Sequence, residues 1–163
     1  MTHLVIGIDI GLSGALAAIS ASGLVAVIDM PTMAKGKGGG RVKNEVDPAA
    51  LNRLLREWCG QCGGDEVLVV IEQVSSMPGQ GVAGMFSLGD SKGAVRGVVA
   101  ARGYATTWVT ASAWKRHFGL PPAKELARAR AIQLYPEAAL GRKKDHGKAE
   151  AILIARFGWE TLR

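Results

Sequence analysis

Residues 4–10 have the sequence Leu-Val-Ile-Gly-Ile-Asp-Ile, an apolar run of strand length that carries one carboxylate near its end. Two further apolar runs follow at residues 15–20 and 24–30, and glycine-bearing turns separate the three. Short apolar runs joined by such turns are typical of an antiparallel meander. We therefore expect these three runs to be neighbouring strands of one sheet.

The rest of the chain alternates between strand and helix patterns. Residues 67–71, Val-Leu-Val-Val-Ile, are continuously apolar, which is typical of a central strand covered on both faces. A helix is predicted from the Asp47 cap to Gly60, others at residues 85–102, 121–135 and 147–157, and a strand at 104–109. Thr110 can cap a further helix. This order predicts an α/β fold in which residues 1–163 form one domain, built on a mixed five-stranded sheet with helices on both faces.

Composition excludes several classes of protein. The chain has 163 residues, 48% of them hydrophobic and 21% charged, so it can bury a core and is not disordered. No apolar run approaches the roughly 20 residues that span a bilayer, and no secretory signal is visible, so we expect a cytoplasmic protein. Cys59 and Cys62 form a lone Cys-x-x-Cys without a second ligand pair, which disfavours a zinc site.

The charge is basic, with 20 Lys and Arg against 14 Asp and Glu. Two segments concentrate it, one at 35–43 and one at 142–148. We expect the glycine-rich stretch at 35–41 to be a mobile loop. The basic residues of the two segments are Lys35, Lys37, Arg41, Lys43, Arg142, Lys143, Lys144 and Lys148. Such clusters bind phosphates and release counterions, although two solvated loops would have the same composition.

Three acidic residues lie in or at the end of apolar elements, namely Asp9, Glu72 and Glu150. A buried carboxylate needs a partner, a metal or an exposed strand end, so Asp9 and Glu72 could also pair with Lys or Arg. His146 shares a helical face with Glu150, and Asp145 lies where a helix cap would. Together these oxygens would select Mg²⁺ or Mn²⁺, and two such ions about 4 Å apart can activate water against a phosphodiester.

Several ordered motifs resemble the RuvC-type Holliday-junction resolvases, and most closely their small phage-borne members. They are Gly7-Ile8-Asp9-Ile10-Gly11, Ile71-Glu72-Gln73, Met77-Pro78-Gly79-Gln80-Gly81 with Met85-Phe86 and Gly93-Ala94 following, and Lys148-Ala149-Glu150-Ala151. The resemblance implies an RNase H-like fold and a homodimer that nicks two opposed strands of four-way junction DNA with Mg²⁺, for which Mn²⁺ can substitute. It also implies two ions per site and a location in the cytoplasm of a bacterial host cell, encoded by the cell or by a phage.

The resemblance also suggests roles for individual residues. Asp9 and Glu72 match the first two acids of the family and Glu150 the last, while either Asp145 or His146 must supply the remaining ligand, because Gly147 occupies its usual position. We expect both residues at the site, since helical phase favours His146 and charge favours Asp145. Lys115 and Lys124 resemble the lysines near the scissile phosphate. Phe86 resembles the residue that enters the centre of the junction, although helical spacing alone would place it in the core. Lys92 is a further candidate DNA contact.

Other functions remain open from the sequence. Gly-Ile-Asp-Ile-Gly also resembles the phosphate loop of sugar kinases and actin-like ATPases, but those need two related domains. No P-loop motif is present. The alternatives are an RNase H-like nuclease acting on RNA or other branched DNA, and a non-catalytic junction-binding module. The retained acids argue against the last, because phosphate binding alone would favour removing negative charge.

Overall fold

The computed structural model describes residues 2–36, 43–60, 62–75 and 78–163. Its main sheet has five strands in the order β3-β2-β1-β6-β7. The meander pairs are antiparallel, whereas β1–β6 and β6–β7 are parallel. This confirms the expected mixed sheet. The strand bounds are Leu4–Asp9 for β1, Ala15–Ser20 for β2, Gly23–Asp29 for β3, Val67–Glu72 for β6 and Ala105–Val109 for β7.

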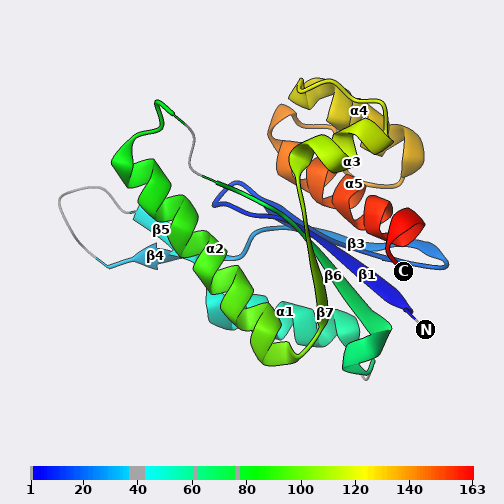
Figure 1. The fold of residues 1–163 in the computed structure, drawn as a ribbon, viewed down its shortest axis with the longest axis horizontal. Coiled ribbons are helices and arrows are strands. Elements are labelled where there is room, and N and C mark those ends of the chain that lie inside the picture. The colour runs from blue at the N-terminus through cyan, green and yellow to red at the C-terminus, as the bar shows by residue number, and fades with distance from the viewer. Residues whose placement is uncertain (1, 37–42, 61, 76–77) are drawn as a thin grey trace.

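Helices cover both faces of this sheet (Figure 1). On one face lie α1 and α2, and on the other α3, α4 and α5, each group packed on its own apolar core. Side chains alternate between the faces, so Val5 packs under α5 while its neighbours Leu4 and Ile6 pack in the other core. The helix bounds are Pro48–Cys59 for α1, Val82–Arg102 for α2, Ala111–His117 for α3, Lys124–Leu134 for α4 and His146–Thr161 for α5.

One predicted loop is a hairpin at its base. Thr32–Lys35 (β4) and Lys43–Val46 (β5) pair antiparallel, with Lys35 opposite Lys43. The expectation of a loop over 35–41 was therefore wrong at Lys35, which ends β4, while residues 37–42 lie outside the described residues. The hairpin has no apolar alternation because β4 is exposed along its whole length. Backbone pairing and the buried Val46 hold it in place, and its side chains show no strand pattern.

Helix limits also differ from the predicted ones. We expected a helix from residue 121, but α4 begins at Lys124, after Pro121 and Pro122. The last helix starts at His146, one residue earlier than expected, and continues to Thr161, following a short 3₁₀ turn at Lys143–Asp145. A second such turn, Gly64–Glu66, precedes β6. In the described ranges no helix is both long and apolar enough to cross a bilayer.

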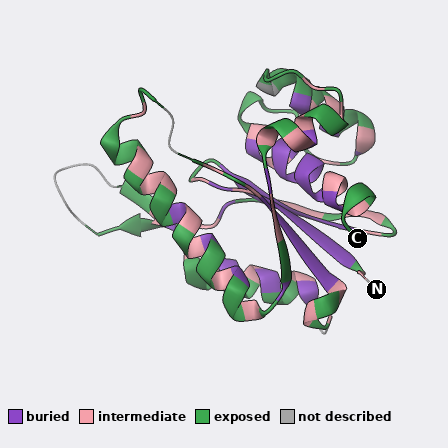
Figure 2. Cartoon of the chain, viewed as in Figure 1, coloured by how far each residue is buried: buried purple, intermediate pink, exposed green. Residues whose placement is uncertain are grey.

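Helix α5 is the central helix of its face and most of it is buried (Figure 2). It crosses β1 at Gly7, where an added Cβ would lie 2.3 Å from the carbonyl oxygen of Ala151 and 2.4 Å from the amide nitrogen of Ala155. Only glycine permits this approach. The contact places Glu150, the residue before Ala151, over β1 on the face of the sheet that α5 covers.

Candidate active site

Asp9 and Glu72 end two neighbouring parallel strands. Ile8 and Ile71 are partners in the register of β1 and β6. Asp9 directly follows Ile8 and Glu72 directly follows Ile71, so the two acidic residues lie at adjacent positions. Neighbouring strands lie about 4.8 Å apart. By alternation from Val5 and Val70, which pack in the α5 core, both side chains point to the face that α5 covers. The strand register therefore brings together the two acids that the sequence singled out.

Glu150 approaches the same face from α5. It is 9% exposed, and one of its oxygens, Oε1, lies 3.9 Å from Nζ of Lys115 on α3. A carboxylate this deeply buried needs a cationic partner, and Lys115 supplies one in this structure. Two residues predicted separately, an acid and a lysine, are therefore in contact.

Helix α3 contributes a residue that the sequence analysis missed. Thr110 caps this helix by accepting a hydrogen bond from the Ala113 amide, and one turn on, the fully buried Trp114 points its indole edge at β6. Nε1 of Trp114 donates to Oε2 of Glu72 at 2.7 Å. The only signal in the sequence was the position of a tryptophan next to Lys115, shortly after the strand that neighbours Glu72.

Asp145 is paired with Arg142 in the turn before α5. Its carboxylate accepts the backbone N–H of Arg142 at 2.8 Å and the Arg142 guanidinium at 2.7 Å, and the residue is 1% exposed. The hydrogen bond from the Arg142 side chain lowers the pKa of Asp145 to about 2. Asp145 does occupy the N-cap position of α5, but it accepts no hydrogen bond from that helix. Its carboxylate closes the preceding turn instead.

His146 has one ring nitrogen paired and one buried. Nε2 lies 3.1 Å from Oε1 of Glu125 on α4. Nδ1 is buried without a hydrogen-bond partner among the residues that the structure describes. His146 and Glu150 are four residues apart on α5 and share a face. Of the two candidates for the remaining metal ligand, only His146 has a buried atom that can bind a metal and has no hydrogen-bond partner in the described structure, namely Nδ1.

These residues fit a divalent metal in chemical kind. Carboxylate oxygens are the ligands that Mg²⁺ and Mn²⁺ prefer, and the unpartnered Nδ1 of His146 is a nitrogen that Mn²⁺ also accepts. As the side chains stand, no three His, Cys, Asp or Glu residues of the described chain are close enough together to hold an ion. Glu150 is paired with Lys115 and His146 with Glu125.

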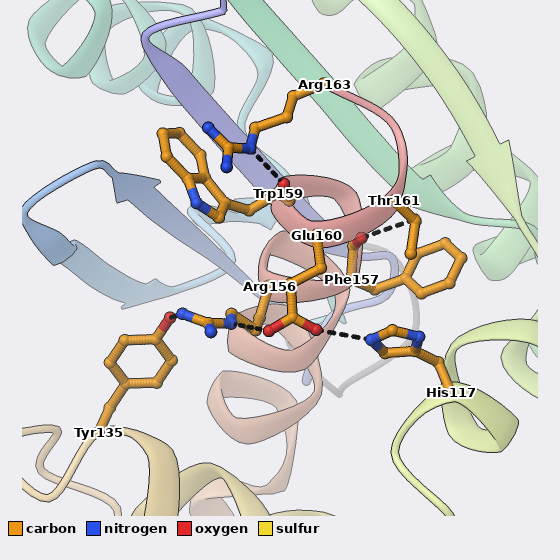
Figure 3. Close-up of polar contacts among 8 residues, drawn as sticks. All are labelled: His117, Tyr135, Arg156, Phe157, Trp159, Glu160, Thr161 and Arg163. Atoms are coloured by element: carbon orange, nitrogen blue, oxygen red, sulfur yellow. Dashed lines mark hydrogen bonds and ion pairs between the residues drawn. The ribbon is translucent and has the colours of Figure 1, made fainter.

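A second polar network fixes α3 against α5 at the far end from Glu150 (Figure 3). Nε2 of His117 lies 2.6 Å from Oε2 of Glu160, whose other oxygen accepts from Arg156, and Arg156 also donates to the Tyr135 hydroxyl. Burial opposes ionisation of Glu160, but hydrogen bonds from His117 and Arg156 keep its pKa below the ordinary value. The ring of His117 also meets Phe157 edge-on. The short helix α3 is therefore held at both ends.

The hairpin and the start of α2 enclose a hollow of about 880 Å³. Phe86 is 69% exposed there, so the core alternative for this residue is wrong. Nζ of Lys35 lies 5.6 Å from the centre of the Phe86 ring, 3.4 Å from Glu45 and 3.8 Å from Asp90. Lys43 also lines the hollow. An exposed aromatic ring beside lysines is an arrangement that can stack on a base and hold its phosphate.

The remaining basic candidates lie in different settings. Arg142, Lys143 and Lys144 are exposed, and Nζ of Lys148 lies 3.4 Å from Asp29. Lys92 donates to the carbonyl of Val74 and stands over the ring of Trp108, so it supports the fold around β6 and β7. Lys124 begins α4, and the position of its side chain is not described. Lys37 and Arg41 lie outside the described residues.

The cysteine pair is unrelated to this site. Cys59 is buried at the end of α1, and burial raises the pKa of its thiol. A thiol with a raised pKa in an apolar setting is unreactive. Cys59 therefore serves as a core residue.

Comparison with solved structures shows where this fold occurs. The chain is similar to Thermus thermophilus RuvC in complex with Holliday junction substrate, with a TM-score of 0.62 and 13% sequence identity over 98% of this chain and 96% of that one. A second Thermus thermophilus RuvC structure gives a TM-score of 0.57 and 18% identity over 96% and 95%. The fold is therefore that of RuvC, an RNase H-like fold, as the motifs implied. No protein-family model matches the sequence, and no curated protein matches it.

Proposed function

We propose that this protein is a Holliday-junction resolvase, a metal-dependent endonuclease that makes paired nicks in opposed strands of a four-way DNA junction. The observation that carries the proposal is the placement of Asp9 and Glu72 at adjacent strand ends, on the face from which Glu150 and Lys115 approach. The RuvC fold over nearly the whole chain supports it, since one of the similar proteins is in complex with a Holliday junction substrate. Fold alone does not define an activity, so the proposal rests on the acids.

The proposed metal ligands are Asp9, Glu72 and Glu150, with His146 as the fourth. Asp145 is left out because both its oxygens serve Arg142. The cofactor would be Mg²⁺, with Mn²⁺ as a substitute, and two ions would fit the family's chemistry. When bound, such ions supply activation of water and stabilisation of the leaving oxygen of the phosphodiester.

The chain's own residues would bind and orient the DNA. Lys115 has a side chain only 17% exposed and lies beside Glu150, so its ammonium is placed to contact a phosphate that enters the site. Phe86 and Lys35 would hold DNA at the hollow beside α2, and the exposed basic residues before α5 would hold a further stretch of backbone. Each of these interactions adds an attraction that weakens with salt.

Paired nicks require two active sites, and we propose a two-fold dimer through the outer face of α2. Gly89, Gly93 and Gly97 are exposed along this helix, and a Cβ added at any of them would meet nothing within 4 Å. Replacing Gly93 with Arg should therefore leave the monomer folded but block close approach of a second α2. Sedimentation velocity at micromolar concentration should show a dimer for the wild type and a monomer for Gly93→Arg. A monomeric wild type that still makes paired nicks would contradict the proposed dimer.

A cleavage assay tests the activity itself. A labelled four-way junction, a linear duplex of matching sequence and an RNA–DNA hybrid are each incubated with Mg²⁺ or with chelator. We expect symmetrical nicks in the junction only, and only with Mg²⁺. Preferential cutting of the hybrid would favour the RNase H-like alternative, and junction binding without any cutting would favour a non-catalytic module.

The salt dependence of binding tests the DNA path. Replacing Lys35, Lys37, Arg41 and Lys43 with Gln should weaken binding to every DNA shape, and it should lower the slope of log K against log salt by about one for each phosphate that the protein no longer neutralises. Replacing Arg53 and Arg56, which are exposed on α1, provides the control and should leave the slope unchanged. An unchanged slope in the hairpin variant would remove this region from the DNA path.

A further inference from the structure

We propose that Trp114 is a positioning residue of the cleavage site, which orients the Glu72 carboxylate through its indole N–H and supports Lys115 through its ring. The inference rests on the proposed function, because it assigns a role around the acids that would hold the metal. Trp114 reaches no solvent, so it acts through Glu72 and Lys115 and not on the DNA itself.

The hydrogen bond to Glu72 is short and directional. The indole N–H can only donate, and at 2.7 Å from Oε2 it is at the length expected of a hydrogen bond to an ionised carboxylate. The ring is packed in the core under α5, which leaves the N–H no freedom to turn away. The carboxylate therefore has a fixed donor on one oxygen. Carboxylates that hold metals depend on such donors for their orientation.

The backbone of the same two elements is also fixed. Glu72 pairs with Val109 in the β6–β7 register, and the amide of the next residue, Gln73, donates to the Val109 carbonyl at 2.7 Å. Thr110 then starts α3, and one turn later Trp114 comes back toward β6. The strand holds the main chain of Glu72 and the helix holds its side chain.

The face of the same indole meets Lys115. Nζ of Lys115 lies 5.2 Å from the centre of the Trp114 ring and 3.9 Å from Oε1 of Glu150. A cation over an indole face is attracted by the electrons of the ring. One buried side chain therefore contacts a proposed metal ligand with its edge and a proposed phosphate contact with its face. A tryptophan needed only to fill the core would require neither contact.

Two variants separate the hydrogen bond from the packing. Trp114→Phe removes the N–H and part of the ring. Substitution of Trp114 by 3-benzothienylalanine keeps the bicyclic shape and replaces the N–H by sulfur, so it tests the donor alone even if Trp114→Phe folds poorly. Trp58→Phe, a half-buried tryptophan of α1 in the opposite core, is the control. Thermal unfolding is recorded for every variant.

The first readout is Mn²⁺ binding to the protein without DNA, measured by calorimetry. The second is the Mg²⁺ concentration that gives half-maximal junction cleavage, with the rate at saturating Mg²⁺ recorded separately. We expect both Trp114 variants to bind Mn²⁺ about 10–100-fold more weakly and to need correspondingly more Mg²⁺, as for other residues that orient metal ligands. Trp58→Phe should match the wild type in both.

Wild-type Mn²⁺ affinity in the benzothienylalanine protein would overturn the proposal, because the donor would then have no role in holding Glu72. A lowered unfolding temperature with unchanged metal binding would overturn it too, by showing that Trp114 only fills the core. A wild-type protein that neither binds Mn²⁺ nor cuts the junction would instead refute the proposed function, and the role of Trp114 would fall with it.

Discussion

The ends of β1 and β6 and the turn before α5 both carry carboxylates, but different interactions fix them. Asp9 and Glu72 are set side by side by the register of two parallel strands. Asp145 is set by one side-chain partner, Arg142, three residues away. The first arrangement is held by backbone pairing in the sheet, whereas the second is held by the main chain and the side chain of one residue in the same turn. The sheet therefore fixes the positions of Asp9 and Glu72, and a local turn fixes that of Asp145.

The two regions also differ in what surrounds the charge. The Arg142 guanidinium lies directly on the carboxylate of Asp145, so this acid is compensated within the protein. At the strand ends two acids occupy neighbouring positions of the strand register, and the donor that α3 gives to one of them is the neutral indole of Trp114. Two carboxylates at neighbouring positions can share a divalent cation. The strand ends are therefore the better place for a metal.

The largest effect should come from the strand ends. Asp9→Asn or Glu72→Gln should lower the cleavage rate at least about 1,000-fold, which corresponds to about 4 kcal/mol of barrier, while junction binding persists or tightens. The rate is measured under single-turnover conditions and binding by gel shift in Ca²⁺. Glu57→Gln, an exposed acid on α1, is the control. Near wild-type nicking by either variant would exclude these acids from the metal site.

A smaller effect should separate His146 from Asp145. His146→Ala should cleave about 100-fold more slowly and require more Mg²⁺, because this variant removes a ligand with a buried nitrogen. Asp145→Asn should stay within about tenfold of the wild type at temperatures where it is folded. His146→Asp restores an oxygen ligand on the same face and should recover activity in Mg²⁺. Full Mg²⁺-dependent activity in His146→Ala together with an inactive Asp145→Asn would reverse the assignment.

The smallest effect concerns the ion pair itself. Because the folded-state pKa of Asp145 is depressed to about 2, its stabilisation is present above the ordinary pKa near 3.9 and disappears as the pH falls toward 2. Arg142→Ala should therefore lower the free energy of unfolding at pH 7, and only slightly, because Arg142 is itself 56% exposed. Urea unfolding of both proteins should show this gap closing between about pH 4 and pH 2. A gap that is constant with pH would mean that Arg142 acts through packing.

Some of these features were predictable from the sequence, and others were not. The strand ends were predictable because apolar runs mark both the strands and the acids that interrupt them, and parallel register follows from the fold class. The Arg142–Asp145 pair was not, since a residue at a helix start is expected to cap that helix. Trp114 was missed because a buried tryptophan resembles any core residue, and the partner of its N–H lies 42 positions away in the chain. The β4–β5 hairpin lacked the apolar alternation that marks a strand.

The location of a bound ion tests the central claim most directly. Crystals of the protein soaked with Mn²⁺ are measured at a wavelength where manganese scatters anomalously, so that each ion is identified independently of the refined side chains. We predict an anomalous peak coordinated by the carboxylates of Asp9 and Glu72, with Asp145 still paired to Arg142. A peak on Asp145 with Arg142 displaced, or no peak at the strand ends at a Mn²⁺ concentration that supports cleavage, would contradict the proposed metal site.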